Sequence, residues 1–204
     1  MEFDVLIIGG GVSGMSAALL FGSAQHKSFM FNKKIGIIVH QKTSSLQTAV
    51  FNNAYGITLG KKGKELLEES KIHLEKLYPH IDQIENEKVL TISGESPLFS
   101  ISTNKNIYRA KNIIIGIGAS NPFTIEGLDE YVIPHQKAAP EKNRLQLKNQ
   151  DYLVKPGLYA VGTLAGLRSQ LMIAAGSGAA VATDIMTLWN DNTPVQIHDA
   201  LPKE

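Results

Sequence analysis

The sequence has no cysteine, little net charge and no long uninterrupted apolar run. Without cysteine, the chain has no structural disulfide, thiolate metal site, cysteine nucleophile or internal dithiol relay. Twenty basic and nineteen acidic side chains leave a formal net charge of +1, which gives no electrostatic reason to bind nucleic acid. No apolar run reaches the roughly 18 residues of a membrane span, and the N-terminus lacks a signal-peptide pattern. We therefore expect a cytoplasmic protein that binds neither nucleic acid nor membranes.

Catalytic motifs of hydrolases and metalloenzymes are also missing. The six histidines are scattered and never stand four residues apart, and no Ser/His/Asp set or carboxylate pair is recognisable. The sequence therefore predicts no metal site, and it identifies no catalytic residue. What it does contain is 43% hydrophobic and 19% charged residues over 204 positions, a composition typical of one globular domain with elaborations.

The N-terminal segment predicts a strand, a tight turn, a helix and a second strand. Residues 3–8 and 35–39 are almost continuously apolar, as expected for parallel strands that are buried on both faces. Small and apolar helix formers at 15–21 lie between them. This order predicts a βαβ unit.

The rest of the chain predicts an antiparallel meander between further helices and buried strands. Residues 41–60 read as loop, and 63–78 as an amphipathic helix that turns its apolar side chains inward, namely Leu66, Leu67, Ile72, Leu74 and Leu77. The later segments are the meander strands 88–93, 98–102 and 107–110, buried strands 112–116 and 158–161, and a helix at 170–189. Residues 119–156 read as an irregular connection, and those after 190 as a frayed tail.

Together these elements predict an α/β fold. We expect a Rossmann-type parallel sheet with a helix layer on one face and an antiparallel β-meander on the other. The prediction is a single domain over 1–190, with halves 1–118 and 157–190 joined by 119–156, followed by a tail at 191–204.

Gly9, Gly11 and Gly14 form a G-x-G-x-x-G pattern between the first strand and the helix. Gly9 permits a tight turn, Gly11 lets a pyrophosphate approach the backbone, and Gly14 allows close helix–strand packing. The free amides at the helix start, at Val12 and Ser13, then favour phosphate oxygens. The motif predicts a dinucleotide, and a purely structural turn is the alternative.

The acidic residue that usually follows the second strand is absent, and His40 and Gln41 stand there, followed by Lys42. Three interpretations remain open. His40 and Gln41 can hold the ribose weakly, His40 and Lys42 can receive the 2′-phosphate of NADP, or all three can be solvated loop residues.

Two later segments carry a resemblance to a known family. Residues 157–163 read Gly-Leu-Tyr-Ala-Val-Gly-Thr, and Arg168-Ser169-Gln170 and an alanine-glycine run at 174–180 follow. This order resembles the second flavin motif of the thioredoxin reductase-like flavoproteins. Residues 113–119 and 53–60 resemble further segments of that family.

The resemblance implies a three-layer FAD-binding domain and extends the predicted cofactor site. In the family, the second motif ends beneath the ribityl chain, and the following helix begins opposite the flavin ring. The residues implied in this sequence are Lys88, Gly116, Gly118, Gly162, Thr163, Gln170 and Leu171.

The sequence departs from that family in three ways. Thr163 replaces an aspartate of the second motif, and His40 replaces the ribose acid. The interval 119–158 is too short for the family's inserted NADPH domain, and no cysteine lies near His135, where the dithiol segment would follow.

The resemblance therefore implies a flavin-dependent oxidoreductase that binds FAD and takes electrons from a separate donor protein or a transiently bound reductant. It also implies a homodimer. A non-catalytic or regulatory flavin-binding protein and a plain NADP(H)-binding Rossmann domain are the alternatives.

Overall fold

The structure is a computed structural model that describes residues 1–41 and 44–198. Its helices are α1 (Val12–Ser23), α2 (Gly63–Leu77) and α3 (Leu171–Trp189). The first strands along the chain are β1 (Glu2–Ile8), β2 (Ile35–Val39), β3 (Val50–Phe51), β4 (Lys61–Lys62), β5 (Asp82–Glu85) and β6 (Val89–Glu95). The later strands are β7 (Leu98–Thr103), β8 (Ile107–Ile115), β9 (Val132–Pro134), β10 (Leu145–Leu147), β11 (Leu153–Lys155) and β12 (Leu158–Ala160).

The main sheet has the strand order β11-β12-β8-β1-β2-β5. The pairings from β12 through β8, β1 and β2 to β5 are all parallel, whereas β11 runs antiparallel to β12 at one edge. A β6–β7 hairpin extends antiparallel from the first half of β8. The predicted Rossmann-type sheet with a meander is confirmed.

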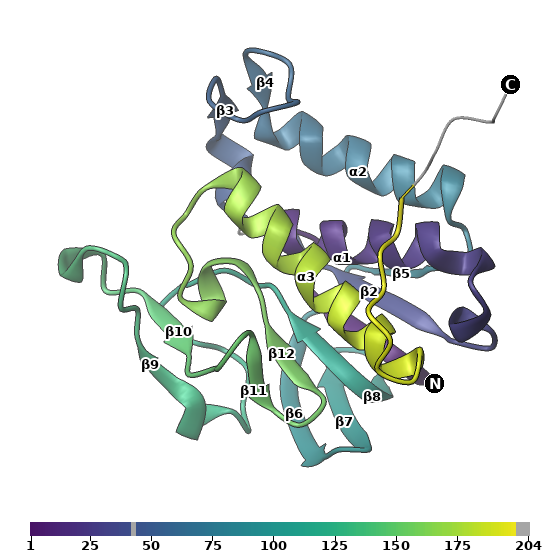
Figure 1. Cartoon of the computed structure of the whole chain (residues 1–204). Helices are drawn as coiled ribbons and strands as arrows, with labels where there is room; N and C mark the ends of the chain where they lie inside the picture. Colours follow the sequence, from purple (N-terminus) through teal and green to yellow (C-terminus); the bar gives the residue numbers. More distant parts are fainter. Residues whose placement is uncertain (42–43, 199–204) are drawn as a thin grey trace, which may run out of the picture.

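The sheet separates two hydrophobic cores, which gives the three layers (Figure 1). On the helix face, Val5 and Ile7 of β1 pack with α1 and α3 side chains such as Phe21 and Val181. On the other face, Leu6 and Ile8 pack with meander residues such as Phe99. β1 is thus buried on both faces, which explains why its sequence is almost continuously apolar.

Small residues let α1 and α3 pack closely (Figure 1). A Cβ on Gly178 would lie only 1.9 Å from the Ser13 carbonyl oxygen, so the contact requires glycine. By length and by its mean hydropathy of 1.5, α3 could cross a membrane, contrary to the expectation that no segment reaches that size. In this fold, one face of α3, which includes Val181 and Ile185, is buried in the helix-side core, and about 33% of its apolar window is buried.

Several elements differ from the sequence prediction. The segments 107–110 and 112–116 form one continuous strand, β8, and β5 was missed. The connection 119–156 is not irregular, because it forms a β9–β10 hairpin and strand β11 and buries Ile125 and Leu128 in the meander-side core.

The helix α2 and the C-terminal tail also depart from expectation. Of the predicted inward side chains, Leu67 and Leu74 are buried, but Ile72 and Leu77 are exposed. The described tail is not frayed, since Val195 and Ile197 pack against the helix-side core. The Val195 backbone N–H donates to Thr187 Oγ1 at 3.1 Å.

Candidate cofactor site

A long cleft crosses the carboxyl ends of five neighbouring parallel strands. Its volume is about 910 Å³. The lining residues that follow β5, β2, β1, β8 and β12 are, in that spatial order, Lys88, His40, Gly9, Gly116 and Gly162. With strands about 4.8 Å apart, these five ends span roughly 19 Å, enough for an extended ligand. We call the part near His40, Glu87 and Lys88 the β2/β5 end, and the part near Gly162, Thr163 and Gln170 the β12 end.

Most of the predicted cofactor residues line this one cleft, although they come from distant parts of the chain. The lining members are Gly9, Gly11, Val12, Ser13, His40, Lys88, Gly116, Gly118, Gly162, Thr163, Gln170 and Leu171. Gln41 and Gly14 are the two predicted residues outside the lining. That the lining residues bind a cofactor stays a prediction.

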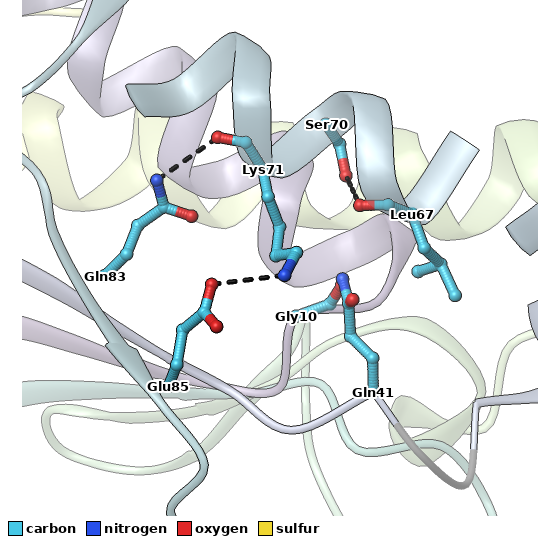
Figure 2. A network of polar contacts seen from close by, with 7 residues as sticks. All are labelled: Gly10, Gln41, Leu67, Ser70, Lys71, Gln83 and Glu85. Atoms are coloured by element: carbon cyan, nitrogen blue, oxygen red, sulfur yellow. Dashed lines mark hydrogen bonds and ion pairs between the residues drawn. The ribbon is translucent and has the colours of Figure 1, made fainter. Parts of the chain in front are cut away.

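Gln41 supports the glycine turn from behind instead of lining the cleft. Its Nε2 donates to the Gly10 carbonyl oxygen at 2.6 Å, and Figure 2 shows its side chain lying against Gly10 beneath α2. Nearby, Lys71 of α2 pairs with Glu85 of β5 at 3.1 Å. The Nε2 group of Gln41 is therefore engaged with the protein backbone, and the interpretation of Gln41 as a ribose contact stays a prediction.

The glycines of the motif have different roles. A Cβ on Gly14 would lie 1.9 Å from the Gly9 carbonyl oxygen, so this glycine serves the packing of the turn against α1. A Cβ on Gly11 would meet only the Gly116 carbonyl oxygen, at 3.9 Å. Gly11 also has an ordinary φ of −78°, so a side chain there would enter the cleft without backbone strain.

The helix ends at the cleft are free to receive an anion. Gly11 caps α1 without a side-chain hydrogen bond, and Gln170 caps α3 in the same way. Neither helix has an acidic residue in its first turn. The unsatisfied backbone N–H groups and the positive end of the helix dipole therefore favour negative charge at both places.

Ser177 fixes the β12 end, a role that the sequence did not reveal. The Gly162 backbone N–H donates to Ser177 Oγ at 2.8 Å, and the Ser177 hydroxyl donates to the Ala174 carbonyl at 2.7 Å. This buried bridge ties the turn after β12 to the first part of α3. A single serine within an alanine-glycine run carries no pattern that would have identified it.

Glu87 organises the β2/β5 end and was also missed. Its buried carboxylate accepts hydrogen bonds from Thr103 Oγ1 at 2.6 Å, Asn106 Nδ2 at 2.7 Å and the Tyr108 hydroxyl at 3.0 Å. Burial alone would raise the pKa of this carboxyl, but the three hydrogen bonds outweigh it, so the pKa lies below its ordinary 4.5. Glu87, which precedes Lys88 at the start of the meander, is thus hydrogen-bonded to the turn between β7 and β8.

The charged groups of the cleft do not form a metal site. Within residues 1–41 and 44–198, no group of three or more histidine, aspartate or glutamate side chains could hold a metal ion. His135, which stands where the family's dithiol segment would follow, is buried beside the β12 end, and its Nδ1 accepts the Lys137 backbone N–H at 3.1 Å.

Comparison with known families shows to which family this chain belongs. A family model described as pyridine nucleotide-disulphide oxidoreductase matches residues 3–163. The chain belongs to the pyridine nucleotide-disulphide oxidoreductase family. The resemblance to thioredoxin reductase-like flavoproteins is thereby confirmed, and the family's cofactor, FAD, is the one expected from the sequence.

The curated relative described next is distant in sequence. The chain is 28% identical over 140 residues to a ferredoxin–NADP reductase of Streptococcus pneumoniae serotype 2 strain D39, a match that covers 63% of this chain and 40% of the relative. The chain thus spans less than half the length of that curated relative.

Solved structures show the same fold. A thioredoxin reductase of Gloeobacter violaceus superposes with a TM-score of 0.72 at 13% identity, covering 98% of each chain. A ferredoxin-flavin thioredoxin reductase of Clostridium acetobutylicum gives a TM-score of 0.65 at 18% identity, covering 93% of this chain and 99% of that one.

The residues of this family member fit the family's cofactor. The cleft is near the upper end of the ~300–1,000 Å³ typical of ligand pockets. Gly11 leaves open space where a phosphate must approach, and the uncapped start of α1 lies beside it. Thr163 lines the β12 end with a hydroxyl that can bond a ribityl oxygen, although it lacks the charge of an aspartate.

Proposed function

We propose that the protein is an FAD-dependent oxidoreductase that receives electrons from a separate donor protein or a transiently bound reductant. The observation that carries this proposal is the cleft itself, in which the open Gly11 turn lies midway along the row of strand ends. Family membership supports FAD as the occupant. When bound, FAD supplies the redox chemistry, and the protein binds it, orients it and controls access to it.

The sheet order supports one orientation of the cofactor. Because β1 is central, a pyrophosphate over the turn at 9–14 leaves one half of the cofactor on each side. The adenosine half extends over β2 toward His40 and Lys88, and the flavin half extends over β8 and β12 toward Thr163 and Gln170. The backbone N–H groups at the start of α3 then lie at the flavin end.

The proposed separate donor is supported by the short stretch between β8 and β12. The stretch between β8 and β12 forms a small hairpin and an edge strand and contains no cysteine. A nicotinamide that reached the flavin end would bind without a domain inserted between β8 and β12 to orient it, and lost orientation costs several kcal/mol of barrier. This supports a donor supplied from outside residues 1–204.

Anaerobic stopped-flow absorbance tests this proposal. We expect slow reduction of the bound flavin by NADPH or NADH and normal reduction by dithionite or light. Rapid, saturable bleaching by either nucleotide would contradict the need for a separate donor. Identification of the small molecule released on denaturation tests the cofactor independently, since a colourless protein that binds NADPH would favour a plain NADP(H)-binding domain.

A flavin-binding protein without turnover is the second candidate. The hydroxyl of Thr163 at the β12 end favours it, because an anionic acceptor is missing there. A yellow protein that no reductase or small reductant can cycle would support it. The 2′-phosphate reading depends on His40, which lines the cleft, and on Lys42, which lies outside the described residues.

Two further expectations belong to the same proposal. The family resemblance implies a homodimer, which native mass measurement would detect. A cytoplasmic location is expected from the sequence, and fractionation of the source cells would test it.

A further inference from the structure

A second, smaller pocket adjoins the β12 end of the cleft. Its volume is about 190 Å³, and it shares Lys142, Arg144, Thr163 and Ser169 with the cleft lining. Its remaining wall comes from the loop between β9 and β10 and from the turn before α3. A group bound here would therefore sit next to whatever occupies the flavin end.

Four cations surround this pocket, and no carboxylate lines it. They are Lys137, Lys142, Arg144 and Arg168, which we call the basic cluster. None of them takes part in an ion pair within the described residues. Like charges gathered around one hollow repel each other, and an anion in the hollow would relieve that repulsion.

The remaining polar groups of the pocket can also donate hydrogen bonds. Because Nδ1 of His135 accepts a backbone N–H, the neutral ring carries its proton on Nε2 and is a donor there. Thr163 and Ser169 add hydroxyl groups, and Ala138, Ala139 and Leu167 complete the wall. A pocket rich in donors, with no carboxylate in its lining, is suited to an anion.

The loop that carries much of the cluster is held in place. The His135 backbone N–H donates to the Arg144 carbonyl oxygen at 2.9 Å, which closes the loop at its base. The buried side chain of Gln146 accepts the Gln136 backbone N–H at 2.9 Å. The cluster is thus built on a loop that is anchored at its base.

We infer that this pocket binds the phosphate or carboxylate group of a small substrate or reductant and so places that molecule against the flavin end. This inference rests on the proposed function, because the flavin end is defined by it. The hollow is smaller than the ~300 Å³ at which drug-sized ligand pockets begin, so it suits one anionic group rather than a whole nucleotide. Its concave shape favours such a group over the flat face of an acidic protein.

The test is a titration of the FAD-loaded protein with inorganic phosphate, followed by calorimetry and by the visible absorbance of the flavin. Loading with FAD keeps phosphate out of the glycine turn. The test variant is Lys137→Gln with Arg168→Gln, because these two residues line the small pocket and not the cleft. The matched control is Lys27→Gln with Arg109→Gln, which removes the same charge from exposed positions that line neither pocket.

We expect saturable phosphate binding that shifts the flavin absorbance. Affinity should fall about tenfold or more in the test variant, since charge-assisted hydrogen bonds are among the strongest in proteins, and should stay within about twofold in the control. The FAD content should be the same in all three proteins. Competition by NADPH but not by NADH would identify the anion as a nucleotide 2′-phosphate, and competition by neither would identify a smaller anion; both support the pocket.

Phosphate binding that is absent, or equally strong in the test variant, would overturn the inference. Binding of a polyglutamate peptide without binding of phosphate would also overturn it, because the basic cluster would then be a protein-docking surface. If the protein holds no FAD, the proposed function fails separately. In that case the phosphate affinities of the cofactor-free wild type, test variant and control still show whether the basic cluster binds the anion.

Discussion

The two ends of the cleft are built differently. At the β2/β5 end, Glu87 supplies a buried carboxylate next to Lys88, and its hydrogen bonds fix the local backbone. At the β12 end, the basic cluster has no such partner. The first end therefore has a backbone fixed by buried hydrogen bonds, whereas the second end has cations without an ion-pair partner among the described residues, as the proposed binding of a further anion requires. The glycine turn at residues 9–14 lies between the two ends, because it follows the central strand β1.

Breaking the glycine turn should have the largest effect. Gly14→Ala places a Cβ 1.9 Å from the Gly9 carbonyl oxygen, so we expect the free energy of unfolding to fall by about 3 kcal/mol. Chemical denaturation measures it. Gly176→Ala is the control, because nothing lies within 4 Å of its Cβ, and it should stabilise α3 by about 0.5–1 kcal/mol. Equal destabilisation by both would refute the packing role of Gly14.

Gly11→Val should separate cofactor binding from folding. The branched side chain enters the cleft where phosphate oxygens must lie, while φ stays in an ordinary region. We expect FAD affinity to fall about a hundredfold, or about 2.7 kcal/mol, with little change in unfolding. Equilibrium dialysis with FAD and a thermal melt measure the two quantities. Full flavin occupancy in the variant would show that the turn is only structural.

Glu87→Gln should weaken the β2/β5 end and change its response to acid. A neutral amide loses charge-assisted hydrogen bonds from Thr103, Asn106 and Tyr108, at a cost of about 1–2 kcal/mol at pH 7. Because the folded pKa of Glu87 lies below 4.5, its contribution is complete above that pH and is lost as the pH falls through the folded pKa.

The difference in unfolding free energy between wild type and Glu87→Gln should therefore shrink below pH 4.5. Urea titrations at several pH values measure it. Glu85→Gln is the control, since the exposed ion pair of Glu85 with Lys71 should contribute less than about 1 kcal/mol. A difference that stays constant down to pH 3 would contradict the assigned ionised state.

His40→Glu should have the smallest effect and the opposite sign. A carboxylate at the end of β2 restores an acceptor for the ribose hydroxyls, so FAD should bind about fivefold more tightly, or about 1 kcal/mol. Equilibrium dialysis with FAD measures this affinity. If FAD affinity falls and NADPH binding disappears, His40 receives a 2′-phosphate instead.

The sequence predicts those elements that are marked by a residue pattern within the element itself. β1, β2 and the second half of β8 are apolar because both faces are buried, and the glycine motif lies in the context that it requires. β5 was missed because Asp-Gln-Ile-Glu has no apolar run, and parallel pairing with β2 at the sheet edge makes it a strand. In β8, Lys111 and Asn112 interrupt the apolar pattern but not the backbone pairing with β1.

Residues of the site that act through distant partners could not be predicted in the same way. Glu87 and Ser177 bond groups that lie 15 or more positions away in the chain, so no spacing pattern identifies them. Gln41 was placed at the correct strand end, but the direction of its side chain depends on Gly10, 31 positions earlier. The β9–β10 hairpin has short strands, and its position depends on buried side chains such as Leu147.

The closed base of the 135–144 loop makes this loop an attachment point for additional protein. Its two ends are joined by the hydrogen bond from His135 to Arg144, so a polypeptide spliced between them would leave and return at one place. Each doubling of loop length costs only about 0.6 kcal/mol, and the parallel sheet would keep its strand order. A fused electron-supplying module would also arrive beside the β12 end. A fusion at this loop would therefore bring a donor close to the β12 end, but it would displace Lys137 and Lys142 and so disrupt the small pocket that they line.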